Sequence, residues 1–185
     1  LYYNRLAKTV ILKQPEKHGT PGEENSTRVA NSGPTFQRVA HYPPVPEPDQ
    51  AITVRGQVND PDGVKSLLLH YADDGSPFRT ASVIMSDNGS WSIQIPGQKS
   101  GRKIQFYLEA DDGEIISFYP KNGPDSRAMI QVNDGRSSSS IQNFRVIMTN
   151  RDSSTMHNSN EILSNHRYGC TIITDEKNIY YDCGV

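Results

Sequence analysis

Residues 104–110 read IQFYLEA, and apolar residues take every second position: Ile104, Phe106, Leu108 and Ala110. A period of two sends successive side chains to opposite faces of a β-strand, so this stretch predicts a strand with one buried and one solvated face. The same alternation recurs at 52–58, 67–71 and 91–95, and shorter β-prone runs occupy 78–85, 115–119 and 128–132. About seven short strands in roughly 100 residues predict an all-β fold.

Turn-forming sequences separate these runs. Asp-Gly or Asn-Gly pairs close the segments 60–63, 73–75, 87–89 and 111–113. Asp, Asn and Gly favour turns because they tolerate positive φ angles. Strands with turn signals between them at this spacing predict an immunoglobulin-like or fibronectin type III-like β-sandwich over residues 34–133. Trp91 begins an inward-facing series and is expected in the core.

The flanking regions differ in composition. In residues 1–33 we expect the last strand of a preceding β domain, around 9–12, and a polar linker. Five prolines between 34 and 48 favour an extended lead-in, within which 36–42 forms an edge strand. Residues 134–185 start with a serine-rich joint and hold too little apolar sequence for a stable domain alone. We expect there an incomplete domain with a strand at 142–148, a short helix at 159–166 and a final hairpin.

Composition excludes some classes of function. The chain has 185 residues, 34% of them hydrophobic, with a mean hydropathy of -0.66 and a net charge of -2. No apolar run approaches the roughly 18–20 residues that cross a membrane, so no membrane span is expected. The near-neutral charge does not suggest a nucleic-acid partner. Because the chain starts at Leu1 without Met and stops inside an apparent strand, we expect it to be a segment of a longer protein.

The two cysteines, Cys170 and Cys183, stand at the ends of the predicted C-terminal hairpin. If its turn centres on residues 176–177, Thr174 faces Ile179 and Cys170 faces Cys183. Directly opposed cysteines on antiparallel strands are close enough to form a disulfide. The alternative is a pair of reduced, buried thiols, and their spacing does not fit a zinc site.

Four motifs follow one another within residues 52–120: NDPDGVKSLLLHY at 59–71, MSDNGSW at 85–91, Ile95-Pro96, and FYLEADDG at 106–113. Together they resemble an immunoglobulin-like module of large secreted bacterial proteins. The resemblance implies an extracellular or cell-surface location.

Residues 141–185 look like the first strands of the spore-coat protein H (CotH) kinase-like family, through NFRVIM at 143–148, LSN at 163–165 and YYDCGV at 180–185. That family implies an atypical kinase-like fold using ATP and a divalent cation, but none of its catalytic residues matches a position in this chain. Residues 19–26, GTPGEENS, resemble the closing peptide of lamin-tail-type domains.

The strongest candidate site in the sequence is acidic. In a fibronectin-like strand order, the turns near 59–63, 86–89 and 111–114 lie at the same end of the sandwich. They carry Asp60, Asp62, Asp87, Asp111, Asp112 and Glu114. Ca²⁺ prefers six to eight oxygen ligands from adaptable loops, so these residues are candidate Ca²⁺ ligands. The alternative is that the carboxylates simply form turns.

No catalytic constellation is predicted for this segment. The five histidines are scattered, and His70 is expected on a solvated strand face. No phosphate-binding glycine loop is present. Four aromatic residues are candidates for an exposed platform that binds sugar or peptide: Tyr42, Tyr107, Phe118 and Tyr119.

These observations leave four hypotheses. The leading one is a non-catalytic spacer or interaction module of an extracellular multidomain protein, with neighbouring domains of the same chain as partners. The second is an adhesion module that binds Ca²⁺ or a surface glycan. The third is an accessory part of a secreted CotH-like kinase. The fourth is a self-associating fibre subunit that donates the β-prone run at 9–12 to a neighbour.

Overall fold

The computed structural model describes residues 29, 31–136, 143–158 and 165–185. The chain divides into two units, Leu1–Ser32 and Gly33–Val185, and every strand of the described residues belongs to the second. The strand expected at 9–12 and the lamin-tail resemblance at 19–26 lie outside the described residues.

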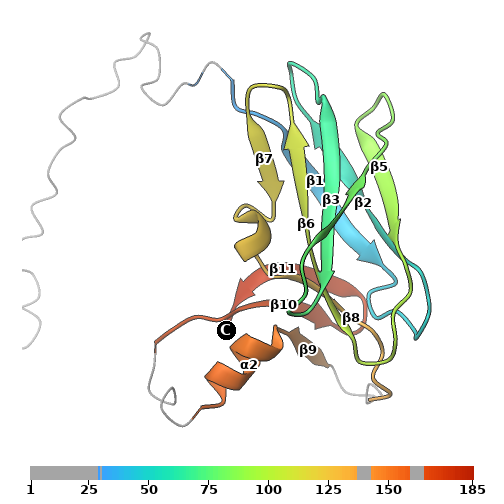
Figure 1. The fold of residues 1–185 in the computed structure, drawn as a ribbon, viewed down its shortest axis with the longest axis vertical. Coiled ribbons are helices and arrows are strands. Elements are labelled where there is room, and N and C mark those ends of the chain that lie inside the picture. The colour runs from blue at the N-terminus through green and yellow to red at the C-terminus, as the bar shows by residue number, and fades with distance from the viewer. Residues whose placement is uncertain (1–28, 30, 137–142, 159–164) are drawn as a thin grey trace, which may run out of the picture. The chain divides into compact units, whose positions relative to one another are not determined.

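Two antiparallel sheets form the sandwich (Figure 1). The smaller has the order β1-β2-β5, and the larger has the order β4-β3-β6-β7, with β8 also paired to β6. The strands are β1 (Thr35–Tyr42), β2 (Ile52–Asn59), β3 (Ser66–Asp73), β4 (Arg79–Ser82), β5 (Ser90–Ile95), β6 (Lys103–Asp111), β7 (Ile116–Tyr119) and β8 (Ala128–Gln131). The predicted all-β, sandwich-like fold is therefore confirmed.

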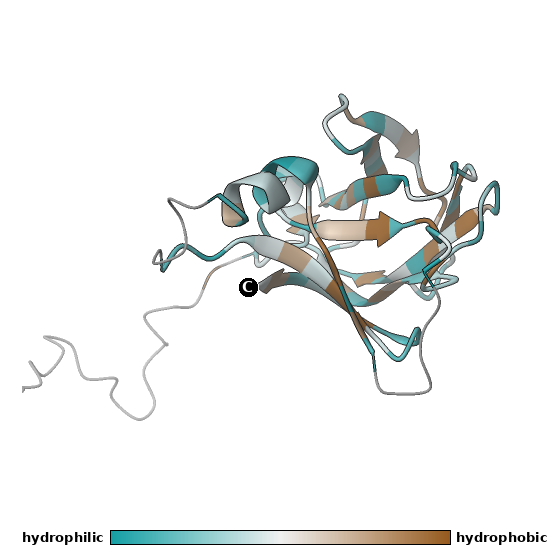
Figure 2. Ribbon diagram, turned by 90° about the horizontal axis from the view of Figure 1, so that it is seen from below, coloured by the Kyte–Doolittle hydropathy of each residue, from teal (hydrophilic) through white to brown (hydrophobic). Residues whose placement is uncertain are grey.

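The core lies between the two sheets and consists of the residues that alternation predicted to face inward. Phe106, Leu108, Ile52 and Leu69 are completely buried, and Trp91 is 4% exposed, as expected for a core residue. Figure 2 shows apolar and polar bands alternating along the strands. The period-two pattern therefore identifies most of the residues of the main core.

The C-terminal segment forms a third sheet, with the order β11-β10-β9. Its strands are β9 (Phe144–Ile147), β10 (Gly169–Thr174) and β11 (Asn178–Gly184). Strand β8 links the two parts because its side chains point in opposite directions. Ala128 and Ile130 enter the sandwich core, whereas Met129 packs with Ile147 and Ile173 in a smaller core.

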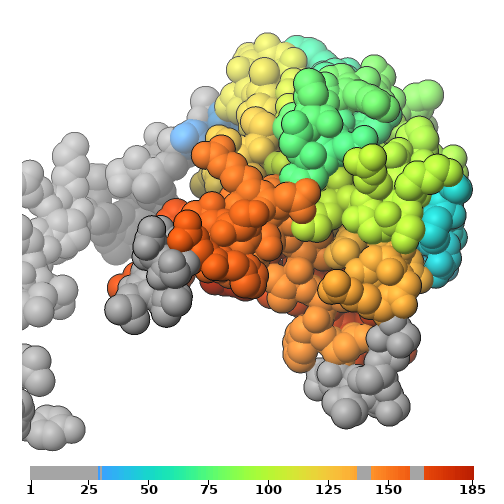
Figure 3. All heavy atoms as spheres, turned by 60° about the horizontal axis from the view of Figure 1, so that its bottom comes forward, coloured from blue at the N-terminus to red at the C-terminus, as the bar shows by residue number. Residues whose placement is uncertain are grey.

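This third sheet packs directly on the sandwich (Figures 1 and 3). The chain on both sides of the expected boundary at 133 thus belongs to one compact unit. The identity of residues 134–185 as the start of a kinase-like domain stays a prediction.

This segment also contains a helix that the sequence did not predict. Helix α2 covers Asn150–Met156, and the side chain of its N-cap residue, Thr149, accepts a hydrogen bond from Asp152 N at 3.0 Å. The helix expected at 159–166 falls largely on residues 159–164, outside the described part, and Asn165 and His166 are not helical.

The predicted cysteine hairpin is present, with one difference in register. Cys170 faces Cys183 as expected, but Thr174 faces Asn178 rather than Ile179. The reason is a bulge in which β11 has one more residue than β10, and it includes Asp182 with a φ of +52°.

Candidate binding groove and neighbouring polar clusters

The turns that carry the predicted acidic ligands meet at one end of the sandwich. Lys65 N donates a hydrogen bond to Asp111 O at 2.8 Å, and Val58 N donates to Gly89 O at 2.9 Å. The β2–β3 turn therefore adjoins both the β6–β7 turn and the turn before β5. This is the neighbourhood that the strand order led us to expect.

The carboxylates at this end shape their own turns. Asp60 Oδ1 accepts from Asp62 N at 2.8 Å, and Asp111 Oδ1 accepts from Gly113 N at 2.6 Å. Asp112 is buried, and its Oδ1 accepts hydrogen bonds from Glu114 N and Ile115 N, both at 2.7 Å. These bonds are the Asx-turn pattern.

The remaining acidic residues add no cation-binding cluster. Asp87 and Glu114 are exposed, and the side chain of Lys65 lies against Gly113, which brings a positive charge to this end. Across the residues that the structure describes, no three or more His, Cys, Asp or Glu side chains are placed to hold a metal ion. Asp60 Oδ2 is buried and has no hydrogen-bond partner among the described residues. Ca²⁺ binding at this end stays a prediction.

His70 is not solvated, contrary to expectation. Its side chain is only 12% exposed, because its ring stacks on Tyr107 with centroids 4.4 Å apart. Thr80 Oγ1 lies 3.0 Å from Nδ1, and Glu109 Oε2 lies 3.4 Å from Nε2. The outer face of the larger sheet therefore covers this histidine with an aromatic neighbour and two polar groups from adjacent strands.

The four aromatic residues of the predicted platform do not share a surface. Tyr107 and Phe118 meet edge to face on the outer side of the larger sheet, with centroids 6.1 Å apart. Tyr119 alternates to the other side of β7 and contacts Phe36, with centroids 6.0 Å apart. Tyr42 is exposed at the end of β1 and has no ring contact with the other three in the described structure.

A groove of about 560 Å³ runs between the start of β1 and strand β7. In the described part of the chain, β1 and β7 are edge strands of their sheets, so the groove follows an open side of the sandwich. Phe36, Phe118, Tyr119 and Tyr181 supply its aromatic lining. Ile116, also at the groove, is 53% exposed, and Phe118 is 37% exposed.

Tyr181 reaches the groove from the C-terminal hairpin. The bulge at Asp182 interrupts the β10–β11 ladder beside it, and its ring contacts Phe106 and Tyr119 with centroids 5.4 and 6.3 Å apart. A residue near the end of the chain thereby completes a surface formed by the sandwich.

Hydrogen bonds to His41 fix the Tyr181 hydroxyl. His41 is 2% exposed, and its Nε2 lies 3.0 Å from Pro44 O. A carbonyl only accepts, so Nε2 carries the proton and the unprotonated Nδ1 accepts from the Tyr181 hydroxyl. The same hydroxyl accepts from His41 N at 3.0 Å. Burial lowers the pKa of His41 to about 4 and raises the pKa of Tyr181 far above its usual value.

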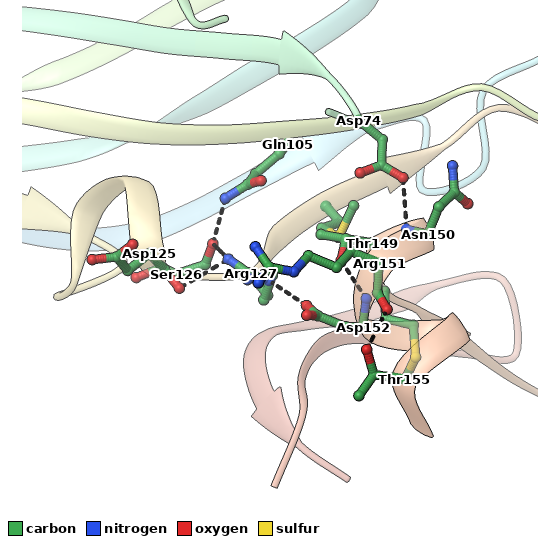
Figure 4. Close-up of polar contacts among 12 residues, drawn as sticks. Asp74, Gln105, Asp125, Ser126, Arg127, Thr149, Asn150, Arg151, Asp152 and Thr155 are labelled. Carbon is green, nitrogen blue, oxygen red and sulfur yellow. Dashed lines mark hydrogen bonds and ion pairs between the residues drawn. The ribbon is translucent and has the colours of Figure 1, made fainter. Parts of the chain in front are cut away.

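Arg127 forms a second polar connection between the sandwich and the C-terminal segment (Figure 4). Its Nε lies 2.9 Å from Asp152 Oδ2 in α2, and its backbone N donates to Asp182 Oδ1 at 2.8 Å. Its carbonyl accepts from Thr171 Oγ1 at 2.6 Å. Arg127 thus connects β8 to α2, β10 and β11.

A second groove, beside Pro44 and Arg145, is charged but internally paired. Arg145 Nε lies 2.6 Å from Glu176 Oε1, and Arg145 Nη1 lies 3.7 Å from Asp134 Oδ1. Its charges are therefore directed at each other rather than at a ligand.

Sequence reasoning missed Phe36 and Tyr181 as groove residues. Phe36 was assigned only to an edge strand, and Tyr181 only to the hairpin. Alternation says which face of a strand a side chain occupies, but it does not say which distant strand lies opposite. The 140-residue separation between His41 and Tyr181 has no local signal.

No protein-family model and no curated protein matches the chain. Among the described residues, no helix has the length and apolar character needed to cross a membrane.

Proposed function

We propose that this chain is a non-catalytic interaction module of an extracellular multidomain protein, and that its groove binds an extended polypeptide strand. One observation carries the proposal: β7 pairs with β6 on one edge, and its other edge has no partner strand among the described residues. The groove lies beside that edge.

An unpaired edge offers backbone N–H and C=O groups to an incoming strand. β7 has four residues, so its ladder accommodates a short segment. Main-chain hydrogen bonds to this edge would provide affinity that depends little on the sequence of the partner.

The side chains around the edge favour an apolar partner. Ile116 and Phe118 project from β7 with large exposed fractions, and Phe36 and Tyr181 line the neighbouring groove. Alternate residues of an added strand would meet these apolar surfaces, which provides selectivity. Among the described residues, the groove lining contains no His, Cys, Asp or Glu, so these residues supply no carboxylate or imidazole for acid–base chemistry.

A surface glycan is the second candidate, favoured by the exposed ring of Phe118 next to Tyr107. A sugar would use ring faces and would not need the free edge of β7. The two candidates therefore differ in which change disrupts binding.

Fluorescence polarisation with two labelled peptides tests the proposal. One peptide copies residues 6–14 of this chain, LAKTVILKQ, and the other alternates valine and threonine between terminal lysines. We expect binding that Ile116→Lys weakens about tenfold or more, because a charge replaces an apolar contact. Ile84→Lys is the matched control, since Ile84 is 89% exposed away from the groove.

Each outcome distinguishes the candidates. Binding of the first peptide alone favours self-association through residues 9–12, and binding of both favours a general strand acceptor. Glycan-array binding that Tyr107→Ala abolishes and Ile116→Lys leaves intact favours the carbohydrate alternative. No binding of either peptide at millimolar concentration rejects the strand-binding proposal.

A further inference from the structure

Strands β10 and β11 hold the two cysteines of the chain in register. Tyr168 and Val185 exchange two backbone hydrogen bonds of 3.0 Å, and Cys170 pairs with Cys183 two residues further along the ladder. Hydrogen-bonded antiparallel pairs place Cα atoms about 5.5 Å apart, which is within the range that a disulfide spans. Paired residues also point to the same face of a sheet, so the two sulfur atoms lie on one side.

The two thiols differ in access. Both are free in the structure, but Cys170 is completely buried, whereas Cys183 is partly exposed. Cys183 Sγ lies 3.5 Å from Tyr180 O and 3.8 Å from Tyr181 O. The backbone register already places the two cysteines opposite each other, and forming the bond would require Cys183 Sγ to turn away from these carbonyls.

We propose that Cys170 and Cys183 form a redox site, in which partly exposed Cys183 reacts first with a small disulfide such as glutathione disulfide and buried Cys170 then closes a cross-strand bond. The oxidised bond would lock the segment that holds Tyr181 in the groove. This proposal does not depend on what the groove binds.

The chemistry balances in two exchange steps. The Cys183 thiolate attacks one sulfur of glutathione disulfide, which breaks that bond, forms a mixed disulfide and releases one glutathione. The Cys170 thiolate then attacks the Cys183 sulfur and releases the second glutathione. The two protein thiols lose two electrons to the glutathione disulfide, and their two protons end on the two glutathione thiols.

The surroundings make the first step slow at neutral pH. Burial, followed by the nearby Cys183 and Asp182, raises the pKa of Cys170 to about 11, and burial also raises the pKa of Cys183. Since the thiolate is the nucleophile, the oxidation rate should rise as the pH is raised above 7.

The effect on β11 follows from the position of Cys183. Cys183 directly follows Asp182, whose backbone N donates a hydrogen bond to Arg127 O at 3.2 Å. Tyr181 directly precedes Asp182. A bond at Cys183 would restrict the bulge between these contacts and the start of β10. We therefore expect slower amide exchange in β11 after oxidation.

Mass spectrometry of the full chain, after incubation with glutathione disulfide and acid quenching, tests the order of events. The wild type should lose two hydrogens and retain no free thiol. Cys170→Ala should stop at a glutathione adduct on Cys183, whereas Cys183→Ser should leave folded Cys170 unmodified. Stable glutathione adducts or disulfide-linked dimers in the wild type would overturn the proposal.

Thermal unfolding provides a second readout, which does not depend on quenching the thiol–disulfide exchange with acid. Oxidised wild type should melt at least about 5 °C above its reduced form, because the bond restricts the unfolded chain. Neither variant should show such a redox-dependent difference. If Cys170→Ala folds poorly, Cys183→Ser alone serves as the control. An unchanged melting temperature in fully oxidised wild type would contradict the proposed stabilisation by the disulfide.

Discussion

The sandwich and the C-terminal sheet are held by different kinds of interaction. The sandwich has a continuous apolar core between two sheets. The C-terminal sheet has a smaller core around Met129, Ile147 and Ile173, supplemented by polar connections to the sandwich. Apolar burial is insensitive to protonation, whereas hydrogen bonds and ion pairs depend on charge state.

The polar connections come from several elements. His41 in β1 holds Tyr181, and Arg127 holds Asp152 and Asp182. Lys103 Nζ, from β6, donates to Met148 O at 2.9 Å. The difference from the sandwich suggests that the C-terminal sheet can be loosened by pH or by single polar substitutions that leave the main core intact.

The largest expected effect is on the main core. Phe106→Ala should lower the free energy of unfolding by about 3–5 kcal/mol, because it removes a fully buried ring and leaves a cavity. Phe118→Ala, at a ring that is 37% exposed, is the control and should cost less than about 1 kcal/mol. Urea unfolding measures both. Similar losses for the two variants would show that the main core is not the dominant source of stability.

The sequence predicted the parts of the fold that depend on local patterns. Alternation identified the sandwich strands and placed Trp91 in the core. The opposition of Cys170 and Cys183 followed from the length of the hairpin. Thr149 is a favoured N-cap residue with an acidic residue in the following turn, so the start of α2 has a local signal in the sequence that was missed.

Other features could not be derived because they depend on distant contacts. The residues next to Asp182 in the sequence carry no signal for the bulge, whereas in the structure Asp182 contacts Arg127, 55 residues away. From the sequence, Met129 is only a residue of a β-strand. The structure shows that it packs with Ile147 of β9 and Ile173 of β10. Asp is both a Ca²⁺ ligand and a turn former, so sequence alone does not separate the two roles, and the structure shows turn-forming hydrogen bonds at Asp60, Asp111 and Asp112.

The next effect in size is a pH dependence specific to His41. Its pKa falls from 6.5 to about 4 on burial, so between these values the unfolded chain binds more protons than the folded chain. Stability should therefore be unaffected by this group above pH 6.5 and fall as pH decreases towards 4. At 1.36 kcal/mol per tenfold change, the total loss is about 3 kcal/mol.

The His41→Gln variant isolates this contribution. Urea unfolding between pH 7.5 and 4 should show a smaller loss of stability in the variant than in the wild type, because glutamine does not titrate. His157→Gln, at an exposed histidine at the end of α2, is the control and should retain the wild-type profile. If His41→Gln also retains it, the connection between β1 and β11 is not pH-sensitive, and that part of the contrast with the sandwich is lost.

The smallest effect concerns the ion pair between Arg127 and Asp152, whose side chains are 24% and 17% exposed. A double-mutant cycle with Arg127→Ala and Asp152→Asn should give a coupling energy of about 1 kcal/mol that decreases in high salt, since partial burial limits but does not remove screening. The control cycle uses Lys99 and Asp49, a pair 2.8 Å apart whose side chains are 78% and 63% exposed. Its coupling should be close to zero, because water competes for both charges. Equal coupling in the two cycles would mean that Arg127 positions α2 through its shape and backbone bonds alone, and that the smaller apolar core, rather than charge, holds the C-terminal sheet to the sandwich.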